Sequence, residues 1–166
     1  MISLPFTPFH LGPALFIGLL FFPFIDIIVI CIASVIIDVE PAYYLFFTNR
    51  GPYHGLLHTY LMATVVGLIL SIVMYPIRRY YLKLLSLFGL KQETNFKNIL
   101  VSALIGTYSH IFLDMFLYPE MKPFYPFEGN PFLYALSVWT VYEICVVAFL
   151  LALPLYVIRL IRSEKS

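Results

Sequence analysis

All four histidines of the chain occur with carboxylates in a sequence that is otherwise poor in charge. His54 and His58 are four residues apart, as are His110 and Asp114, and His10 is the remaining histidine. On one helix this spacing places two side chains about 40° apart, so that both can bind one cation. Imidazole nitrogens and carboxylate oxygens without a sulfur ligand suit Zn²⁺, and also Mn²⁺ or Fe²⁺. The pattern therefore predicts a site for one or two divalent ions.

Asp38 and Glu40 form a further pair of candidates inside an apolar stretch. Residues two apart diverge on a regular helix. Glu40, however, precedes Pro41, and the residue before a proline is displaced from the helical region. We therefore expect a helix break that lets both carboxylates face one cavity. An aspartate inside a membrane costs ~3 kcal/mol on insertion scales, and no Lys or Arg shares these segments, so a divalent cation is the expected partner.

The composition indicates that membrane helices position these groups. Hydrophobic residues make up 61% of the chain and charged residues 11%, and the mean hydropathy is +0.91. A soluble domain carries about 25% charged residues. We predict an all-α, polytopic membrane helix bundle of about five helices, with residues 1–166 in one transmembrane domain and the lipid bilayer as its surroundings. The net charge of +1 and the lack of a basic stripe argue against nucleic acid as a partner.

Five apolar segments are predicted, at residues 11–22, 27–47, 55–75, 98–118 and 133–161. A bilayer requires about 20 residues of helix, so we expect the first segment to cross at a thin point or to be re-entrant. Asp26 is predicted to cap the second segment at its N-terminus. Residues 1–7 contain no Lys or Arg, so we expect no cleavable signal peptide and count the first segment as part of the mature protein.

Lys and Arg are distributed unevenly between the two ends of the predicted bundle. Five lie between the third and fourth segments and three in the C-terminal tail, whereas the opposite side has only Arg50 and Lys122. The positive-inside rule then predicts a cytoplasmic C-terminus and an N-terminus outside the inner membrane. All four histidines, Asp38, Glu40 and Asp114 consequently lie toward the outer face.

Three other features have structural interpretations. The loop at 118–134 contains four prolines and several aromatic residues, so it is predicted to be an irregular anchor at the membrane interface or a lid over the site. Glu143, in the fifth segment, is predicted to make a hydrogen-bonded helix contact. Cys31 and Cys145 each stand alone in an apolar run and are predicted to act as small buried hydrophobic residues.

The order of these motifs resembles that of a family of inner-membrane-associated proteins described as LexA-binding and as metal-dependent hydrolases. The matching motifs are Phe9-His10, Asp38-Val39-Glu40, Gly55-Leu56-Leu57-His58-Thr59 and Ser109-His110-Ile111-Phe112-Leu113-Asp114. The family's third motif is His-Arg-Gly-x-x-His-Ser, and here Tyr53 and His54 occupy its first two positions. The resemblance therefore does not carry His54 over as a ligand, and it implies a hydrolase as the reaction class.

Together, the residues and the resemblance lead us to expect a membrane-embedded metal-dependent hydrolase. The expected metal ligands are His10, Asp38, His58, His110 and Asp114. A divalent cation there would acidify a coordinated water. Glu40 is the candidate base, and His54 is expected to bind a second metal or the leaving group. A site near the outer face favours a lipid or another amphiphile, such as a phosphoester.

Two alternatives use the same cluster. An ion or proton-coupled transporter would also need ionisable residues within the membrane, although the cytoplasmic half offers no matching polar path in the sequence. A purely structural metal that pins the helices together is the other alternative. Replacing Asp114 with Asn would separate the three, because it would abolish hydrolysis, flux or folding respectively.

Overall fold

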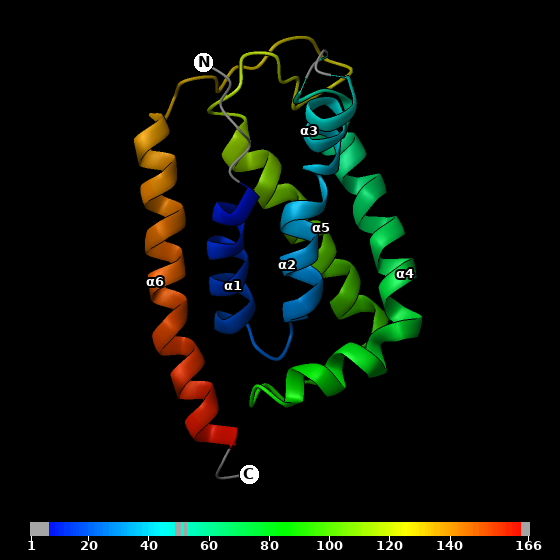
Figure 1. Ribbon diagram of the computed structural model, residues 1–166, viewed down its shortest axis with the longest axis vertical. Coiled ribbons are helices and arrows are strands. Elements are labelled where there is room, and N and C mark those ends of the chain that lie inside the picture. The colour runs from blue at the N-terminus through cyan, green and yellow to red at the C-terminus, as the bar shows by residue number, and fades with distance from the viewer. Residues whose placement is uncertain (1–6, 49–50, 52, 164–166) are drawn as a thin grey trace.

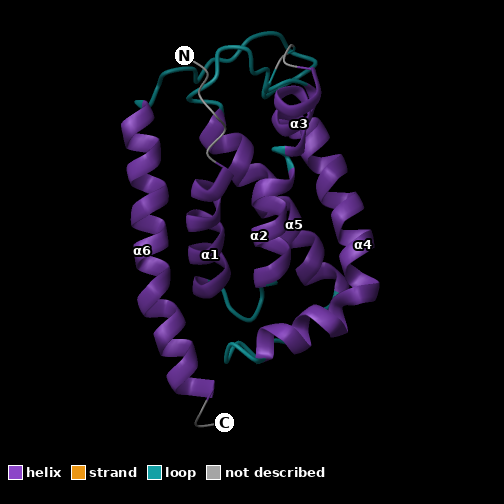
Figure 2. Cartoon of the chain, viewed as in Figure 1, coloured by secondary structure: helices purple, strands orange, loops and turns teal. Residues whose placement is uncertain are grey.

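The computed structural model describes residues 7–48, 51 and 53–163, and these form an all-helical bundle, as predicted. The main helices are α1 (Leu11–Leu20), α2 (Ile27–Ile36), α3 (Val39–Tyr43), α4 (Tyr60–Ser86), α5 (Phe96–Asp114) and α6 (Val138–Ser163). A 3₁₀ turn, Thr7–His10, leads into α1. Figure 1 shows most helices running roughly along one axis, while the last part of α4 turns across the lower end; α3 and the long loop before α6 lie at one end and the C-terminus at the other. Loops and turns gather at the two ends (Figure 2).

Three helices, α4, α5 and α6, are long and apolar enough to cross a membrane. Together α2 and the segment Val39–Thr48 are also long and apolar enough, but they are bent by 46°, so the pair is either a broken fourth span or a re-entrant loop. The apolar helix at Pro8–Leu20 is shorter than a membrane span, in agreement with the prediction of a short first segment. The sequence therefore places a short helix beside three or four full spans.

The predicted break in the second segment lies earlier than expected. The chain leaves the regular helix at Ile37 and Asp38, and α3 then starts at Val39. Pro41 lies in the first turn of α3, where a proline is tolerated because the amide it lacks would have no partner within the helix. Asp38, rather than Glu40, consequently lies at the bend.

The third predicted segment, 55–75, is wrong at both ends. The helix α4 begins at Tyr60, after Thr59 caps it by accepting a 3.1 Å hydrogen bond from the Met62 amide. It continues through Pro76, as neighbouring groups allow in membrane helices. His54 and His58 therefore precede the helix, and the prediction that they share one helix face is wrong.

The last two spans are shifted from their predicted positions, because α5 covers Phe96–Asp114 rather than 98–118, and α6 covers Val138–Ser163 rather than 133–161. The loop between them is irregular, as its prolines predicted. Asp26 caps α2 as predicted, since its Oδ1 accepts a 3.0 Å hydrogen bond from the Val29 amide. Cys31 and Cys145 are unpaired and pack in apolar clusters.

The contact between α2 and α5 sets the position of the candidate ligands. A Cβ on Gly106 of α5 would lie 2.5 Å from the Ala33 Cβ and 2.7 Å from the Ile30 carbonyl oxygen, so only glycine permits this approach. His110 follows one turn later on α5 and faces the C-terminal end of α2. In contrast, α6 packs mainly on α1 and leaves most of its residues exposed.

Candidate metal centre

Four buried side chains from three parts of the chain meet at one end of the bundle. Asp38 comes from the bend between α2 and α3, His58 from the 3₁₀ turn Leu56–His58, and His110 and Asp114 from the last two turns of α5. One ligand atom from each of the four lies within 4.8 Å of the others. The tertiary fold therefore gathers two imidazoles and two carboxylates where the sequence predicted a cluster.

The separations within the group match those expected around one cation. His110 Nε2 lies 3.1 Å from Asp114 Oδ2, 3.4 Å from Asp38 Oδ1 and 3.4 Å from His58 Nε2. His58 Nε2 lies 3.8 Å from Asp38 Oδ1 and 3.9 Å from Asp114 Oδ2. Nitrogen and oxygen ligands about 2.0–2.1 Å from a tetrahedral zinc are about 3.3 Å apart. Small adjustments would therefore close the group around an ion.

Both imidazoles are oriented by partners on their outer nitrogen. His110 Nδ1 lies 2.7 Å from the Ser34 carbonyl oxygen, which can only accept, so Nδ1 carries the proton. His58 Nδ1 lies 3.0 Å from Glu40 Oε2 in the same way. Such outer partners fix the tautomer of metal-binding histidines. The two Nε2 lone pairs consequently face each other across 3.4 Å, an arrangement that a cation between them would stabilise.

Asp38 gives the clearest sign of a missing partner. Neither of its carboxylate oxygens makes a hydrogen bond with any described residue, although both atoms are buried. A buried carboxylate without a partner is costly. His58 responds to the same negative surroundings: burial alone would lower its pKa, but the negative charge of the adjacent Asp38 and Glu40 carboxylates outweighs burial and raises it. The residues present therefore fit a divalent cation.

His10, the fifth predicted ligand, adjoins the group of four. Its Nε2 lies 3.2 Å from Asp114 Oδ1, and its ring stacks on His110 with 4.1 Å between centroids. Its Nδ1 is buried and has no hydrogen-bond partner among the described residues. With 10% of its side chain exposed, His10 is the most accessible of the five. His10 therefore lies on the more exposed side of the group.

Glu40 supports the centre from outside. Its Oε2 accepts hydrogen bonds from the Gly55 and Leu57 amides, each at 3.1 Å, in addition to its contact with His58. This carboxylate therefore holds the 53–58 segment in place and orients the His58 ring. The geometry favours a positioning role, and a role as base stays a prediction.

His54 lies beside the group of four but outside it. Its Nδ1 lies 2.9 Å from Glu120 Oε1, and its ring stacks on Tyr118 with 3.5 Å between centroids. Burial lowers the pKa of His54 and keeps its imidazole neutral. The sequence reasoning missed Glu120, because no spacing relates it to the motifs. His54 therefore connects the centre to the loop that follows α5.

Glu143 does not make the predicted helix contact. Its side chain is exposed on α6 and forms no hydrogen bond with the described residues. The helix turns this position outward because Val141 and Cys145, on its other face, are the buried residues. Glu143 is therefore outside the candidate centre.

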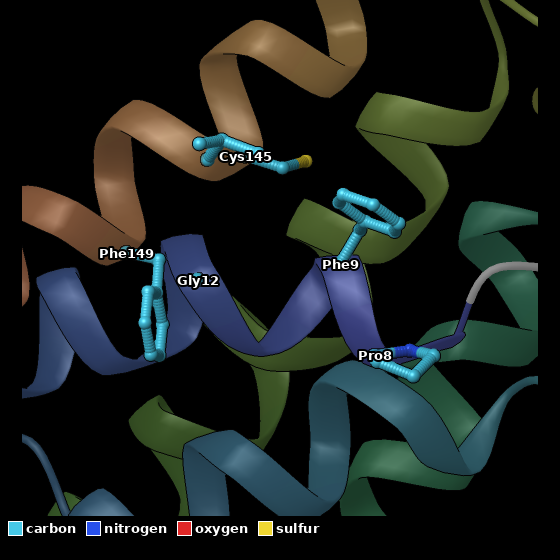
Figure 3. A pocket seen from close by; sticks show the side chains of 6 residues that line it. Pro8, Phe9, Gly12, Cys145 and Phe149 are labelled. Atoms are coloured by element: carbon cyan, nitrogen blue, oxygen red, sulfur yellow. The ribbon is translucent and has the colours of Figure 1, made fainter.

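An apolar hollow of about 210 Å³ lies between α6 and the start of α1, next to His10. It is lined by Pro8, Phe9, Gly12, Cys145, Val146 and Phe149. Figure 3 shows the Cys145 sulfur directed toward the Phe9 ring, with Phe149 farther along the same gap. Phe9 immediately precedes His10 in the chain, although His10 itself does not line the hollow.

The model of the YdjM inner membrane protein family matches residues 7–165. The match covers nearly the whole chain, so the chain belongs to this family, and its placement in the membrane agrees with the apolar helices. No curated protein and no solved structure matches the chain. Of the resemblance seen in the sequence, the inner-membrane family is thereby confirmed, whereas the hydrolase and LexA-binding descriptions stay predictions.

Proposed function

We propose that this YdjM-family inner membrane protein is a membrane-embedded metal-dependent hydrolase that acts on a lipid or another amphiphilic ester, phosphoesters included. One observation carries the proposal: Asp38, His58, His110 and Asp114 bring ligand atoms within 4.8 Å of one another, while neither Asp38 oxygen has a hydrogen bond from a described residue. The nitrogen and oxygen donors favour zinc, with Mn²⁺ or Fe²⁺ as alternatives.

Each residue near the centre has a separate task in this proposal. Asp38 and Asp114 supply negative charge, and His58 and His110 supply neutral nitrogens. Once bound, a divalent cation would polarise a substrate oxygen and lower the pKa of a coordinated water toward neutrality. Glu40 and the Ser34 carbonyl hold the two imidazoles in the required tautomer. His10, in contact with Asp114, would meet the substrate first.

The apolar hollow supports an amphiphilic substrate. Its lining is almost free of polar groups, and one of its lining residues, Phe9, is the chain neighbour of His10. An acyl or similar chain lying in this hollow would bring an adjoining ester group toward the centre. The burial of apolar chain surface would contribute about 0.8 kcal/mol for each CH₂ group. The substrate would thus enter from the membrane rather than from water.

The arrangement of charges supports an outward-facing centre. Seven basic residues lie on the second half of α4, in the loop after α4, on the first turn of α5 or on the last turns of α6, and Figure 1 shows these segments at the end of the bundle away from α3 and the bend that carries Asp38. By the positive-inside rule that end faces the cytoplasm, so the centre lies toward the outer surface of the inner membrane and the C-terminus inside.

The distribution of buried charged groups argues against transport. Apart from the cluster around the centre, Asp26 at the far end of α2 is the only buried carboxylate or imidazole among the described residues. An ion or proton leaving the centre toward the other end would therefore find no carboxylate or imidazole along the buried part of the bundle before Asp26. This supports a site that ends within the membrane, as hydrolysis requires.

Metal content and lipid turnover measured on the same preparation test the proposal. The full chain, purified in mild detergent, should contain about one transition-metal ion by elemental analysis and should hydrolyse a component of an inner-membrane lipid extract, followed by mass spectrometry. Asp114→Asn should lose both ion and turnover yet keep its elution volume and unfolding temperature. Glu143→Gln, which changes an exposed carboxylate on α6, should leave both unchanged.

Three results would contradict this function. A metal-free protein of normal stability would remove the mechanism. An Asp114→Asn variant that fails to fold when the ion is lost would indicate a structural metal. Cation flux into vesicles, without turnover of any lipid, would indicate a transporter.

A further inference from the structure

A second hollow, of about 410 Å³, opens at the end of the bundle opposite the metal centre. It is lined by Phe22, Gly89, Lys91, Arg159, Arg162 and Ser163. These residues come from the turn after α1, the loop after α4 and the last turns of α6, which Figure 1 shows converging near the C-terminus. Neither the proposed hydrolase nor the family description assigns a role to this hollow.

Three cations converge on the hollow, and none of the described carboxylates pairs with them. Among the described residues, Lys91, Arg159 and Arg162 form no salt bridge, and no acidic residue lines the hollow. Like charges held together in this way repel one another and create a positive potential that an anion would relieve. The hollow therefore has the electrostatics of an anion site.

Arg159 is held in a fixed orientation. Its Nη2 donates to the Phe22 carbonyl oxygen at 3.0 Å and approaches that of Leu19 at 3.5 Å, and its guanidinium lies 4.6 Å from the centre of the Phe22 ring. These contacts with the end of α1 use one of its two terminal nitrogens. The remaining guanidinium N–H groups are left for a ligand, in a geometry that suits phosphate oxygens.

The loop after α4, which forms the wall of the hollow opposite Arg159, is also held in place. Gly89 has φ +71°, and a Cβ there would lie 2.4 Å from Leu160 Cδ2, so the loop approaches α6 more closely than another residue would allow. The Tyr156 hydroxyl donates a 3.0 Å hydrogen bond to the Phe88 carbonyl oxygen. Lys91 on the loop and Arg162 on α6 are thereby kept on two sides of one preformed space.

The surroundings distinguish a lipid from a dissolved anion. Val157, Ile158 and Ile161, on the last turns of α6, are about half exposed and present an apolar surface beside the cations. This end also carries most of the basic residues of the chain, and the positive-inside rule assigns it to the cytoplasmic leaflet, which is rich in anionic lipids. Basic pockets between membrane helices on that side are suited to phospholipid head groups.

We propose that this hollow binds the phosphate group of an anionic phospholipid from the cytoplasmic leaflet. Arg159 and Arg162 contact the phosphate from α6, Lys91 contacts it from the loop, and the acyl chains lie against the exposed apolar residues of α6. Attraction of basic residues to helix C-termini accounts for Arg159, at the end of α1, and for Arg162, in the last turn of α6. It does not explain why Lys91, from another segment, faces the same space.

The test is a lipid titration of the delipidated full chain in detergent, followed by native mass spectrometry. The probes are phosphatidylglycerol and phosphatidylcholine of equal chain length, and inorganic phosphate as competitor. The double variant Lys91→Gln/Arg162→Gln removes two cations and keeps Arg159, which supports α1. Arg79→Gln/Lys83→Gln is the matched control, since it removes the same charges from exposed positions on α4 that do not line the hollow.

We expect the unmodified chain to prefer phosphatidylglycerol at least about tenfold over phosphatidylcholine. The hollow variant should bind phosphatidylglycerol about thirtyfold more weakly, and the control variant within about twofold of the unmodified chain. Equal weakening in both variants would overturn the proposal, because general charge would then explain the binding. Equal affinity for the two lipids, or displacement of the lipid by equimolar phosphate, would overturn it as well. An unfolding temperature measured for each variant would show that the hollow variant is folded.

Discussion

Asp26 and Asp38 are both buried carboxylates that precede a helix, but only Asp26 has its partners within the protein. Asp26 Oδ1 accepts from the Val29 amide at 3.0 Å, and Oδ2 accepts from the Tyr81 hydroxyl at 2.9 Å. Asp38 has no hydrogen bond from a described residue and faces His58 and His110 instead. The charge of a buried carboxylate can thus be stabilised in two ways: by hydrogen-bond donors within the protein, or by a cation bound from solution.

The surroundings of the two residues extend the contrast. Around Asp26, the Gln92 side chain donates to the Ile25 carbonyl and Ser102 Oγ accepts from the Asp26 amide, so the polar groups bind together the turn between α1 and α2. Around Asp38, two imidazole lone pairs converge on a space with two carboxylates. The first arrangement is closed and structural, and the second is suited to a ligand.

The strongest test of this contrast is the same substitution at both positions. We expect Asp38→Asn to reduce the metal content from about one ion per chain to almost none, because the amide removes a charged ligand. Asp26→Asn should leave the metal content unchanged. Elemental analysis of the purified variants measures both. Metal loss from Asp26→Asn with Asp38→Asn unaffected would reverse the assignment.

A smaller effect is expected when the support of the centre is altered. Glu40→Gln leaves the four candidate ligands in place but removes the anion that holds the His58 proton on Nδ1. Such outer partners contribute about 10–100-fold to metal affinity, so we expect a loss in this range in a competition titration with a chelator. Glu120→Gln, which alters only the His54 contact, is the control and should change the affinity by less than about threefold. An unchanged affinity in Glu40→Gln would contradict the positioning role.

The metal affinity of the centre should also depend on pH. Because the pKa of His58 is raised, His58 takes up a second proton, at Nε2, more readily as the pH falls, and an incoming ion must displace that proton. Affinity should therefore fall as the pH falls, by about tenfold per pH unit for each displaced proton. The chelator titration repeated between pH 8 and 6 measures this slope. A flat profile would mean that His58 does not bind the ion.

The smallest effect is expected when the hydrogen bonds around Asp26 are altered. Tyr81→Phe leaves Asp26 Oδ2 without its donor and should lower the free energy of unfolding by about 1–3 kcal/mol without changing the metal content. Tyr108→Phe is the matched control, since the Tyr108 hydroxyl bonds with Thr64 at an exposed position, and it should cost less. Denaturation of both variants in the same detergent measures the difference. Metal loss in Tyr81→Phe would show that the two ends are coupled.

Several features of the site were predictable because they depend on local chemistry. Asp26 follows a turn and precedes an apolar run, and this pattern alone predicted its cap. The i, i+4 pair of His110 and Asp114 lies on α5, and its two side chains approach within 3.1 Å. For His54 and His58 the same spacing failed, because Thr59 begins the helix after them. Equal spacing has different consequences on a helix and in the segment before it.

The membrane location, the approximate spans and the gathering of the polar residues at one end were determined by the sequence itself, because hydropathy sets the depth of every residue. Only the tertiary structure decided which of them meet. Gly106 lets α5 approach α2 and turns His110 toward the Ser34 carbonyl, while the bend at Asp38 directs a carboxylate inward. Depth in a membrane is a property of one segment, whereas a coordination site depends on how several helices are rotated and packed.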